Sequence, residues 1–213
     1  GPGAIVRCNK VKPRLDPSSL DAVILTHKHL DHSGDVNVII EAITEGGFRK
    51  RGVLFAPRDS FGEDGVILSY LEGFLDKKVV LKEGRYHLGD IDFACPVKNI
   101  HTVETYGVKF HLGKDVVSFV SDTRYFEGLV DAYRDSTILV LNVVFYQPRP
   151  GYDHLCLDEA ITLAEKIKPE KTIFTHFGMS MLRAKPYILE AKIRKEHSSI
   201  KFAHDGLELK LPT

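Results

Sequence analysis

A run of nine residues, Thr26–Gly34, carries three histidines and one aspartate within six positions: His27, His29, Asp31 and His32. Protonated imidazoles this close would repel one another, whereas neutral imidazole and carboxylate groups are good ligands for zinc and similar ions. The alternate positions His27 and His29 can point the same way, and Asp31 and His32 can serve a second ion. A polar turn in which Asp31 or Ser33 caps the next helix is the alternative. Capping leaves the histidines unexplained, so the run predicts a metal site.

Three short apolar runs end directly before a potential ligand. Each is rich in β-branched residues, as buried strands are, and each ends in Ser or Thr. Strands that deliver ligands from their carboxyl ends would build a site on a rigid edge. A lone aspartate or histidine after a strand is more often a turn or loop residue, but the shared pattern favours ligands. The runs are Val23–Thr26 before His27, Val117–Ser121 before Asp122, and Thr172–Thr175 before His176.

Apolar strands alternate with helical patterns along the chain, which predicts an α/β or α+β fold for residues 1–213 as a single domain. Strands are expected at Ala22–Thr26, Val53–Ala56, Val79–Leu81, Ile91–Cys95, Tyr106–Leu112, Val116–Ser121, Thr137–Val143 and Lys171–Thr175. Helices are expected at Val36–Ile43, Val66–Phe74, Leu157–Ile167 and Tyr187–His197. Hairpins are expected around Gly89 and Gly113, and between Phe202 and Leu207–Leu211.

Bulk composition is that of an ordinary globular chain, with 43% hydrophobic and 27% charged residues and a formal net charge of zero. Nothing in this balance favours general attraction to membranes or nucleic acids. No apolar stretch approaches the about 20 residues of a membrane span. Cys8, Cys95 and Cys156 cannot all pair and show no Cys-x-x-Cys spacing, which favours a reduced, cytoplasmic setting.

The His-x-His-x-Asp-His run after an apolar strand resembles the signature of the metallo-β-lactamase-fold hydrolases. Further matches follow in the order that this superfamily shows, namely His101 in Asn99–Glu104, Asp122 after its strand and His176 after its strand. The resemblance implies a four-layer αβ/βα sandwich with the metal site along one edge of two sheets. It also implies two divalent ions, zinc first, with manganese or iron as alternatives. His27, His29 and His101 would hold one ion, Asp31, His32 and His176 the other, and Asp122 both.

The same residues indicate which branch of the superfamily the sequence resembles most. Di-iron oxygen-reducing members of the superfamily replace the second motif histidine with Glu, which His29 does not match, and the β-lactamases proper lack the bridging Asp122. The tRNA 3′-end ribonucleases of the Z type insert a long arm between the equivalents of His101 and Asp122. Only a hairpin fits here, because Asp122 comes 21 positions after His101. The sequence is therefore more similar to the compact cyclic-phosphodiesterase relatives within the ribonuclease Z-like branch.

His154 stands ahead of Leu155–Ala160, a run that resembles the His-Leu-Ser-Leu-Glu-Glu-Ala pattern of these phosphodiesterases. The resemblance implies that His154 lies beside the metals and protonates the leaving oxygen. A helix-entry residue bonded to backbone is an equal alternative. Arg149 and Tyr152, in a loop rich in aromatics and proline, and Arg124 after Asp122 are candidate substrate contacts. For each of these three, a surface role is the alternative.

The expected function is hydrolysis of small or cyclic phosphodiesters through a metal-bound hydroxide held near Asp31. Two divalent ions carry four positive charges, and Asp31, Asp122 and a hydroxide cancel three, so an anionic diester is favoured over a neutral amide. Alternatives are a lactone or thioester hydrolase with the same metals, a tRNA-processing endonuclease, and a non-catalytic assembly or binding protein. A small phosphodiester is the expected partner, with no membrane, and nucleic acid is not favoured.

The chain starts at Gly1-Pro2-Gly3, a segment that in the resembling family follows an initial pair of strands and an acidic turn. The expectation is that these first strands are absent. An uncovered sheet edge invites pairing with another chain, which makes a homodimer possible.

Overall fold

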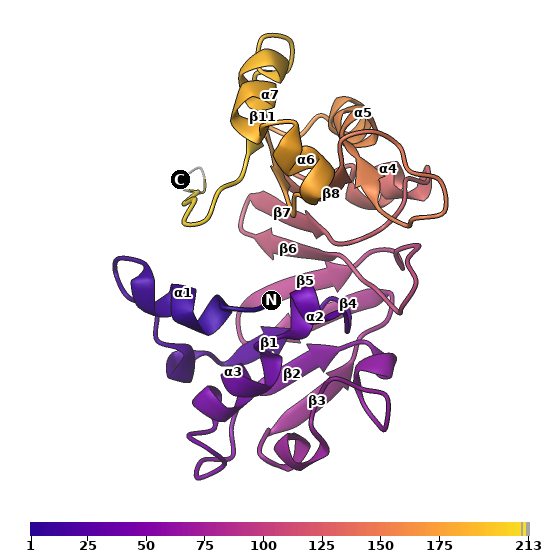
Figure 1. Ribbon diagram of the computed structural model, residues 1–213. Coiled ribbons are helices and arrows are strands. Elements are labelled where there is room, and N and C mark those ends of the chain that lie inside the picture. Colours follow the sequence, from indigo (N-terminus) through magenta and orange to yellow (C-terminus); the bar gives the residue numbers. More distant parts are fainter. Residues whose placement is uncertain (210, 212–213) are drawn as a thin grey trace. The chain divides into compact units, whose positions relative to one another are not determined.

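A computed structural model describes residues 1–209 and 211 (Figure 1). The chain divides into two compact units, Gly1–Lys82 and Glu83–Thr213, called here the N-terminal and the C-terminal unit. Each unit builds its own sheet. That both belong to one domain stays a prediction. In both units helices and strands alternate along the chain, so the expectation of a mixed α/β fold is confirmed.

The N-terminal unit contains a parallel sheet in the order β1-β2-β3. Helix α3 presents Val36 and Ile40 to a core that also contains Leu54 and Leu71. Burying side chains of this size contributes about 1.5–3 kcal/mol each, so this face fixes α3 against the strands. The elements are α1 Ala4–Lys10, η1 Pro17–Ser19, β1 Ala22–Ile24, α2 Leu30–Ser33, α3 Val36–Ile43, β2 Val53–Ala56, η2 Arg58–Ser60, η3 Ser69–Gly73 and β3 Lys77–Val80.

The C-terminal unit contains an eight-stranded mixed sheet in the order β11-β10-β8-β7-β6-β5-β4, with β9 paired to β8. Strands β4 to β7 are antiparallel neighbours, whereas β7, β8, β10 and β11 run parallel. The strands are β4 Gly84–Leu88, β5 Ile91–Cys95, β6 Val108–Leu112, β7 Asp115–Val120, β8 Ile138–Phe145, β9 Leu155–Cys156, β10 Lys171–Thr175 and β11 Ile200–Phe202. The parallel half carries the carboxyl ends of β7, β8, β10 and β11 to one edge of the sheet.

Helices of the C-terminal unit pack on apolar strand residues. Leu139, Leu141 and Phe174 are fully buried in a core that takes in Leu163 from α5. Helix α5 begins at a capping box, in which the amide of Cys156 donates to Glu159 Oε2 at 2.9 Å. The helices are α4 Gly128–Tyr133, α5 Leu157–Ile167, α6 Met179–Arg183 and α7 Pro186–Ile193.

Several expected elements appear with the expected bounds: the strands Val53–Ala56, Ile91–Cys95 and Lys171–Thr175, and the helices Val36–Ile43 and Leu157–Ile167. The expected hairpins around Gly89 and Gly113 are also present, as β4-β5 and β6-β7. Strand ends elsewhere differ by a few residues. These elements combine a clear apolar period with glycine, proline or capping signals at their ends.

Three expectations were wrong. Val66–Phe74 is a helix only over Ser69–Gly73, of the 3-10 type, because Ser60 O accepts from the amides of Val66 and Ile67 and holds them in a turn. The helix expected to reach His197 ends at Ile193, where turn bonds take over. No strand includes residues 207–209 or 211, so the last hairpin is not formed over the described residues, and Lys210 lies outside them.

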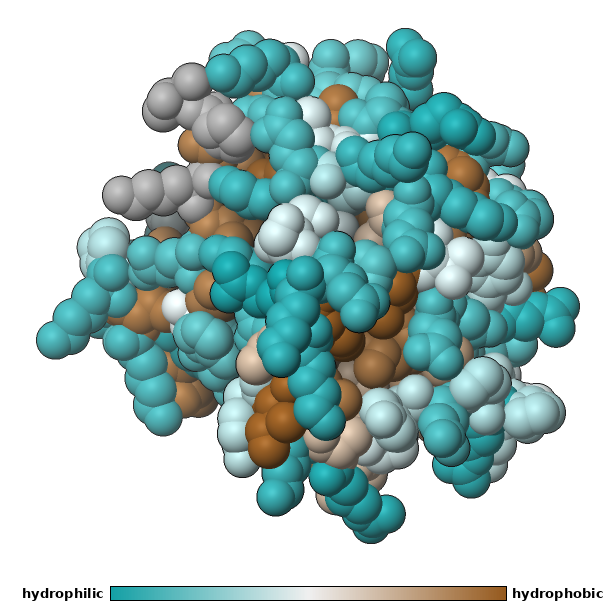
Figure 2. Space-filling model, turned by 90° about the horizontal axis from the view of Figure 1, so that it is seen from above, coloured by the Kyte–Doolittle hydropathy of each residue, from teal (hydrophilic) through white to brown (hydrophobic). Residues whose placement is uncertain are grey.

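The face seen in Figure 2 is mostly hydrophilic, with apolar side chains showing as separate patches. Exposed large hydrophobic residues occur in both units, among them Leu30, Phe48, Met179 and Tyr187. Among the described residues, no helix combines the length and the apolar character needed to cross a membrane.

Gly107, just before β6, lies where the backbone comes close to Tyr133 and to Phe119 of β7. A Cβ atom at this position would lie 2.2 Å from the hydroxyl of Tyr133 and 2.6 Å from the carbonyl oxygen of Phe119. Tyr133 is fully buried and the carbonyl belongs to a strand, so neither atom can give way cheaply.

We therefore expect Gly107→Ala to lower the free energy of unfolding by about 1–3 kcal/mol, the usual cost of overpacking. Urea unfolding followed by circular dichroism measures this change. Gly73→Ala is the matched control, because a Cβ there meets nothing within 4 Å. Its effect should stay below about 1 kcal/mol. Equal stability of the two variants would contradict the close contact at Gly107.

Candidate metal centre

The histidine-rich run lies between β1 and α3 in the N-terminal unit. The amide of Leu25, just past β1, still bonds to Phe55 O at 2.8 Å, so the sheet extends to the edge of the motif. Ser33 then fastens the loop, since its amide donates to His29 O at 2.9 Å and its hydroxyl donates to Lys28 O at 3.1 Å. His27 therefore lies just beyond the carboxyl end of β1, and it is fully buried.

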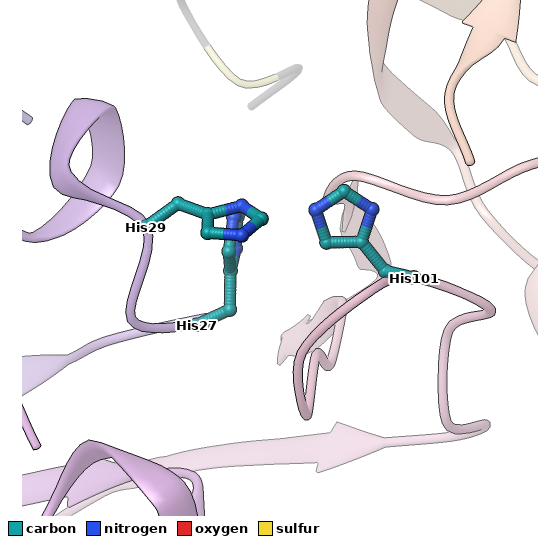
Figure 3. A group of neighbouring side chains, drawn as sticks. All are labelled: His27, His29 and His101. Carbon is teal, nitrogen blue, oxygen red and sulfur yellow. The ribbon is translucent and has the colours of Figure 1, made fainter. Parts of the chain in front are cut away.

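The imidazoles of this run lie against one another. The ring centroid of His27 is 4.9 Å from that of His29 and 4.0 Å from that of His32. Figure 3 shows the rings of His27 and His29 next to each other. Asp31 Oδ2 lies 3.6 Å from His32 Nε2. The capping alternative is wrong, because no side chain caps α2 or α3, and Asp31 sits inside the first turn of α2. The predicted ligands of this unit are therefore gathered together.

In the C-terminal unit, parallel pairing brings Asp122 and His176 to one edge of the sheet. Val120, at the end of β7, is in register with Leu141 on β8, and Thr175, at the end of β10, is in register with Asn142. The residues that follow β7 and β10 therefore flank the same point of β8. His176 has a φ of 59°, a left-handed conformation that costs free energy for a residue with a side chain and that clusters at functional sites.

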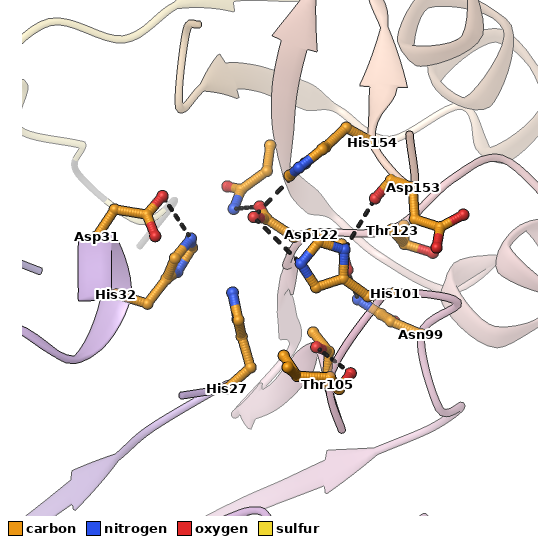
Figure 4. A network of polar contacts seen from close by, with 12 residues as sticks. His27, Asp31, His32, Asn99, His101, Thr105, Asp122, Thr123, Asp153 and His154 are labelled. Atoms are coloured by element: carbon orange, nitrogen blue, oxygen red, sulfur yellow. Dashed lines mark hydrogen bonds and ion pairs between the residues drawn. The ribbon is translucent and has the colours of Figure 1, made fainter. Parts of the chain in front are cut away.

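The carboxylate of Asp122 is the centre of this cluster (Figure 4). Its oxygens lie 4.0 Å from His101 Nε2, 3.6 Å from His154 Nδ1 and 3.9 Å from His176 Nδ1. The side chain is only 1% exposed. Asn142 Nδ2 donates to Asp122 Oδ1 at 2.8 Å, and Asn99 Nδ2 donates to the backbone oxygen of Asp122 at 3.1 Å. These bonds hold the carboxylate in one orientation.

His101 has a defined tautomer. Its Nδ1 lies 3.0 Å from the backbone oxygen of Asp153, and because a carbonyl can only accept, Nδ1 carries the hydrogen. In the neutral ring, the lone pair is then on Nε2, the atom that faces Asp122. An imidazole that donates its other N–H to a carbonyl is the usual arrangement of a metal-binding histidine.

His154 precedes β9 and the capped start of α5. Its ring is 4.9 Å from that of His101 and 5.8 Å from that of Phe145, and its side chain is 21% exposed. Cys156 follows closely, and burial raises the pKa of its thiol to about 11, so it stays protonated at neutral pH. The thiol of Cys156 is therefore not a nucleophile at this site near neutral pH.

These donors fit divalent metal ions. His101, Asp122 and His154 each offer one ligand atom, and these atoms lie within 4.8 Å of one another. Nitrogen and oxygen ligands bind zinc at about 2.0–2.2 Å, so two ligands of one ion are at most about 4.4 Å apart. The separations of 3.6–4.0 Å around Asp122 fall within this limit and exceed hydrogen-bond lengths. Imidazole with carboxylate suits zinc, manganese or iron.

The three candidate substrate contacts occupy different positions. Arg149 stacks on Tyr152, with its guanidinium carbon 4.3 Å from the ring centroid. Tyr152 in turn contacts Phe145, ring to ring at 5.8 Å. Arg124 lies apart from this stack, with its Nε 3.9 Å from Asp153 Oδ1 and its side chain 59% exposed. Asp153 thus contacts Arg124 through its carboxylate and His101 through its backbone oxygen.

Sequence reasoning missed the polar residues that orient the ligands. Asn142 lies inside an apolar strand run, Leu139–Val144, where an amide is unexpected, and this was the available signal. Asp153 acts through its backbone oxygen, which no sequence pattern marks.

Comparison with known proteins places these observations in context. The model of the β-lactamase superfamily domain matches residues 2–177. The chain is 32% identical to the uncharacterized protein MJ1374 of Methanocaldococcus jannaschii, over 99% of this chain and 80% of that protein.

Solved structures show the same fold. The metallo-β-lactamase fold protein YhfI of Bacillus subtilis is 21% identical, with a TM-score of 0.79 over 97% of this chain and 83% of that chain. A structure described as a new diphosphatase from the PhnP family is 27% identical, with a TM-score of 0.67 over 91% of this chain and 72% of that chain.

Proposed function

We propose that this chain, which belongs to the β-lactamase superfamily, is a metal-dependent phosphodiesterase acting on small or cyclic diesters. The observation that carries the proposal is the buried Asp122 carboxylate with three imidazole nitrogens within 4.0 Å. The ligands of the two units would act together on two divalent ions. His27, His29 and His101 would hold one, Asp31, His32 and His176 the other, and Asp122 both.

Divalent ions held by these residues would activate water as a nucleophile near neutral pH and stabilise negative charge that develops on phosphoryl oxygens. The protein residues would supply the rest. Asp31, exposed at the start of α2, would orient the attacking water. Asn142 and the backbone oxygen of Asp153 would keep Asp122 and His101 in position. His154, at 3.6 Å from Asp122, would donate a proton to the leaving oxygen.

An anionic substrate agrees with the charges of the proposed ligands. Two divalent ions contribute four positive charges, and Asp31 and Asp122 cancel only two before water is deprotonated. The centre therefore keeps a net positive charge that favours a phosphodiester over a neutral lactone, thioester or β-lactam.

A substrate panel tests the proposal. Purified protein is assayed with bis(p-nitrophenyl) phosphate, a 2′,3′-cyclic nucleotide, a lactone, a thioester, a β-lactam and a precursor tRNA. We expect hydrolysis of the two diesters that is lost with chelator and regained with zinc or manganese. Hydrolysis of lactones or thioesters alone would contradict the phosphodiesterase proposal, and cleavage of the tRNA in preference to the small diesters would favour the endonuclease alternative.

A further inference from the structure

One face of the antiparallel half of the C-terminal sheet carries two histidines and an aspartate in a single row. His87 on β4 is directly opposite Asp92 on β5, and Asp92 is directly opposite His111 on β6. Directly opposite residues of paired strands point to the same face of a sheet. All three side chains are exposed. The row therefore gathers three groups that can bind a metal ion and that the proposed hydrolysis does not use.

This row is separate from the Asp122 cluster. His111 pairs with Val116 near the start of β7, whereas Asp122 follows the end of that strand. Because a strand rises about 3.3 Å per residue, the backbone from Val116 to Asp122 spans roughly 20 Å. The row and the Asp122 cluster therefore lie at opposite ends of β7 and cannot share an ion.

The spacing of the three strands suits one ion above Asp92. A residue of a middle antiparallel strand directs its N–H and C=O to one neighbour, so it forms a hydrogen-bonded pair on one side and a closer, non-hydrogen-bonded pair on the other. The Cα atoms of His87 and His111 are therefore about 10 Å apart. An ion midway lies about 5 Å to the side of each Cα atom, which an imidazole with a zinc–nitrogen bond of about 2.0–2.1 Å can span.

Two of the three side chains already converge, since His87 Nδ1 contacts Asp92 Oδ1. His111 completes the group by a change of side-chain rotamer, which takes picoseconds to nanoseconds for an exposed residue. Lys109, the preceding residue of β6 on the same face, has its ammonium group bonded to Asp135 Oδ1. Its positive charge is therefore balanced by a carboxylate outside the row, and Asp92 stays available for an ion.

We propose that His87, Asp92 and His111 bind one zinc or similar divalent ion, and that this ion fastens β4, the edge strand of the sheet, to β6. Two imidazoles and a carboxylate form a usual protein ligand set for zinc, and water completes the tetrahedron. The site is open to solvent and has three protein ligands, so dialysis removes its ion more readily than ions of the buried centre. The inference does not depend on the proposed hydrolysis.

An NMR titration tests the shared ion. Zinc is added to protein that has been loaded with zinc and dialysed, and the ring Cε1–Hε1 signals of the histidines are followed. The signals of His87 and His111 should shift with one common midpoint, whereas that of His204, an exposed turn residue, should not move.

Variants of the same hairpin make the titration specific. Asp92→Asn should raise the zinc midpoint at least about 10-fold, since loss of even a group that only orients a ligand costs that much. Asp90→Asn, in the turn between β4 and β5, is the matched control and should leave the midpoint unchanged. In His87→Ala the His111 signal should no longer shift at the wild-type midpoint. An unaltered His111 shift in that variant, or no shift of either histidine in the wild type, would overturn the inference.

Hydrogen exchange tests the fastening of β4. An ion that binds only the paired strands suppresses their opening by the factor 1 + [zinc]/Kd, so zinc at 100 times Kd should slow exchange of the β4 amides bonded to β5 by up to about 100-fold. The amides of β11, at the other edge of the same sheet, are the internal control. The slowing should shrink at least about 10-fold in Asp92→Asn. Exchange of β4 that does not respond to zinc in the wild type would overturn the proposed fastening.

Discussion

Asp122→Ala is expected to release metal and abolish hydrolysis. Asp122 is proposed to contact both ions, so the variant should lose occupancy at both positions, not one. Activity should fall by more than the about 10²–10³-fold that loss of one oxyanion-stabilising donor costs, because the groups that activate water are lost with the metal. Metal content by mass spectrometry of the purified variant, together with its turnover of a nitrophenyl diester, measures both effects.

Asp131→Ala is the control for this variant, since Asp131 is an exposed residue of α4 paired only with Arg134 among the contacts observed for it. It should keep full metal content and activity. Because Asp122 is buried, circular dichroism is used to check that both variants are folded. Full metal retention in folded Asp122→Ala would remove Asp122 from the metal centre.

His154→Ala is expected to have an effect that depends on the leaving group. If His154 protonates the leaving oxygen, its loss should lower turnover of alkyl or nucleoside diesters by about 10²–10⁴-fold, the typical contribution of one general acid. A nitrophenolate leaves without a proton, so nitrophenyl diesters should be affected much less. The plot of log kcat against leaving-group pKa should therefore become steeper in the variant.

His204→Ala serves as the control, because His204 is an exposed turn residue of the same unit. Metal content decides between two roles of His154. Retained metal with a steeper plot supports the proton donor. Loss of metal, with equal losses for good and poor leaving groups, would make His154 a ligand instead, a role that its 3.6 Å separation from Asp122 also permits.

The place of Asp122 and His176 at one sheet edge was predictable because both residues follow strands whose sequence pattern is strong. Each proposed ligand after β1, β7 or β10 comes at the carboxyl end of an apolar, β-branched run. Parallel strands place such ends together, so Asp122 and His176 could be expected at one edge without any knowledge of distances. The family resemblance supplied His101, which follows a loop and has no such signal.

Residues that act through tertiary contacts were not predictable. Asn142 bonds to Asp122 because β8 lies between β7 and β10, and that strand order is not written in any local pattern. Arg183 and Arg149 line the same pocket because α6 packs beside the end of β8. Similarly, α1 shows no buried residue in the structure, and its sequence lacks the apolar stripe by which a helix is recognised.

Expected helices failed where loop bonds outweighed local propensity. Residues Val66 and Ile67 donate to Ser60 O, and Leu68 donates to Asn37 Oδ1 at 3.1 Å, so the backbone groups that a helix would use are bonded elsewhere. These partners lie outside the segment itself. Helical spacing over a short apolar run is a weak predictor when such bonds exist.

The number of divalent ions bound per chain tests the central claim most directly. The wild-type protein is stripped with chelator, titrated with zinc, dialysed and analysed for metal and protein in the same sample, with activity on a cyclic diester recorded at each step. We predict about two ions per chain at saturation, with activity rising as they bind. A protein that binds no zinc, manganese or iron, or that hydrolyses the diester equally well without metal, would contradict the account.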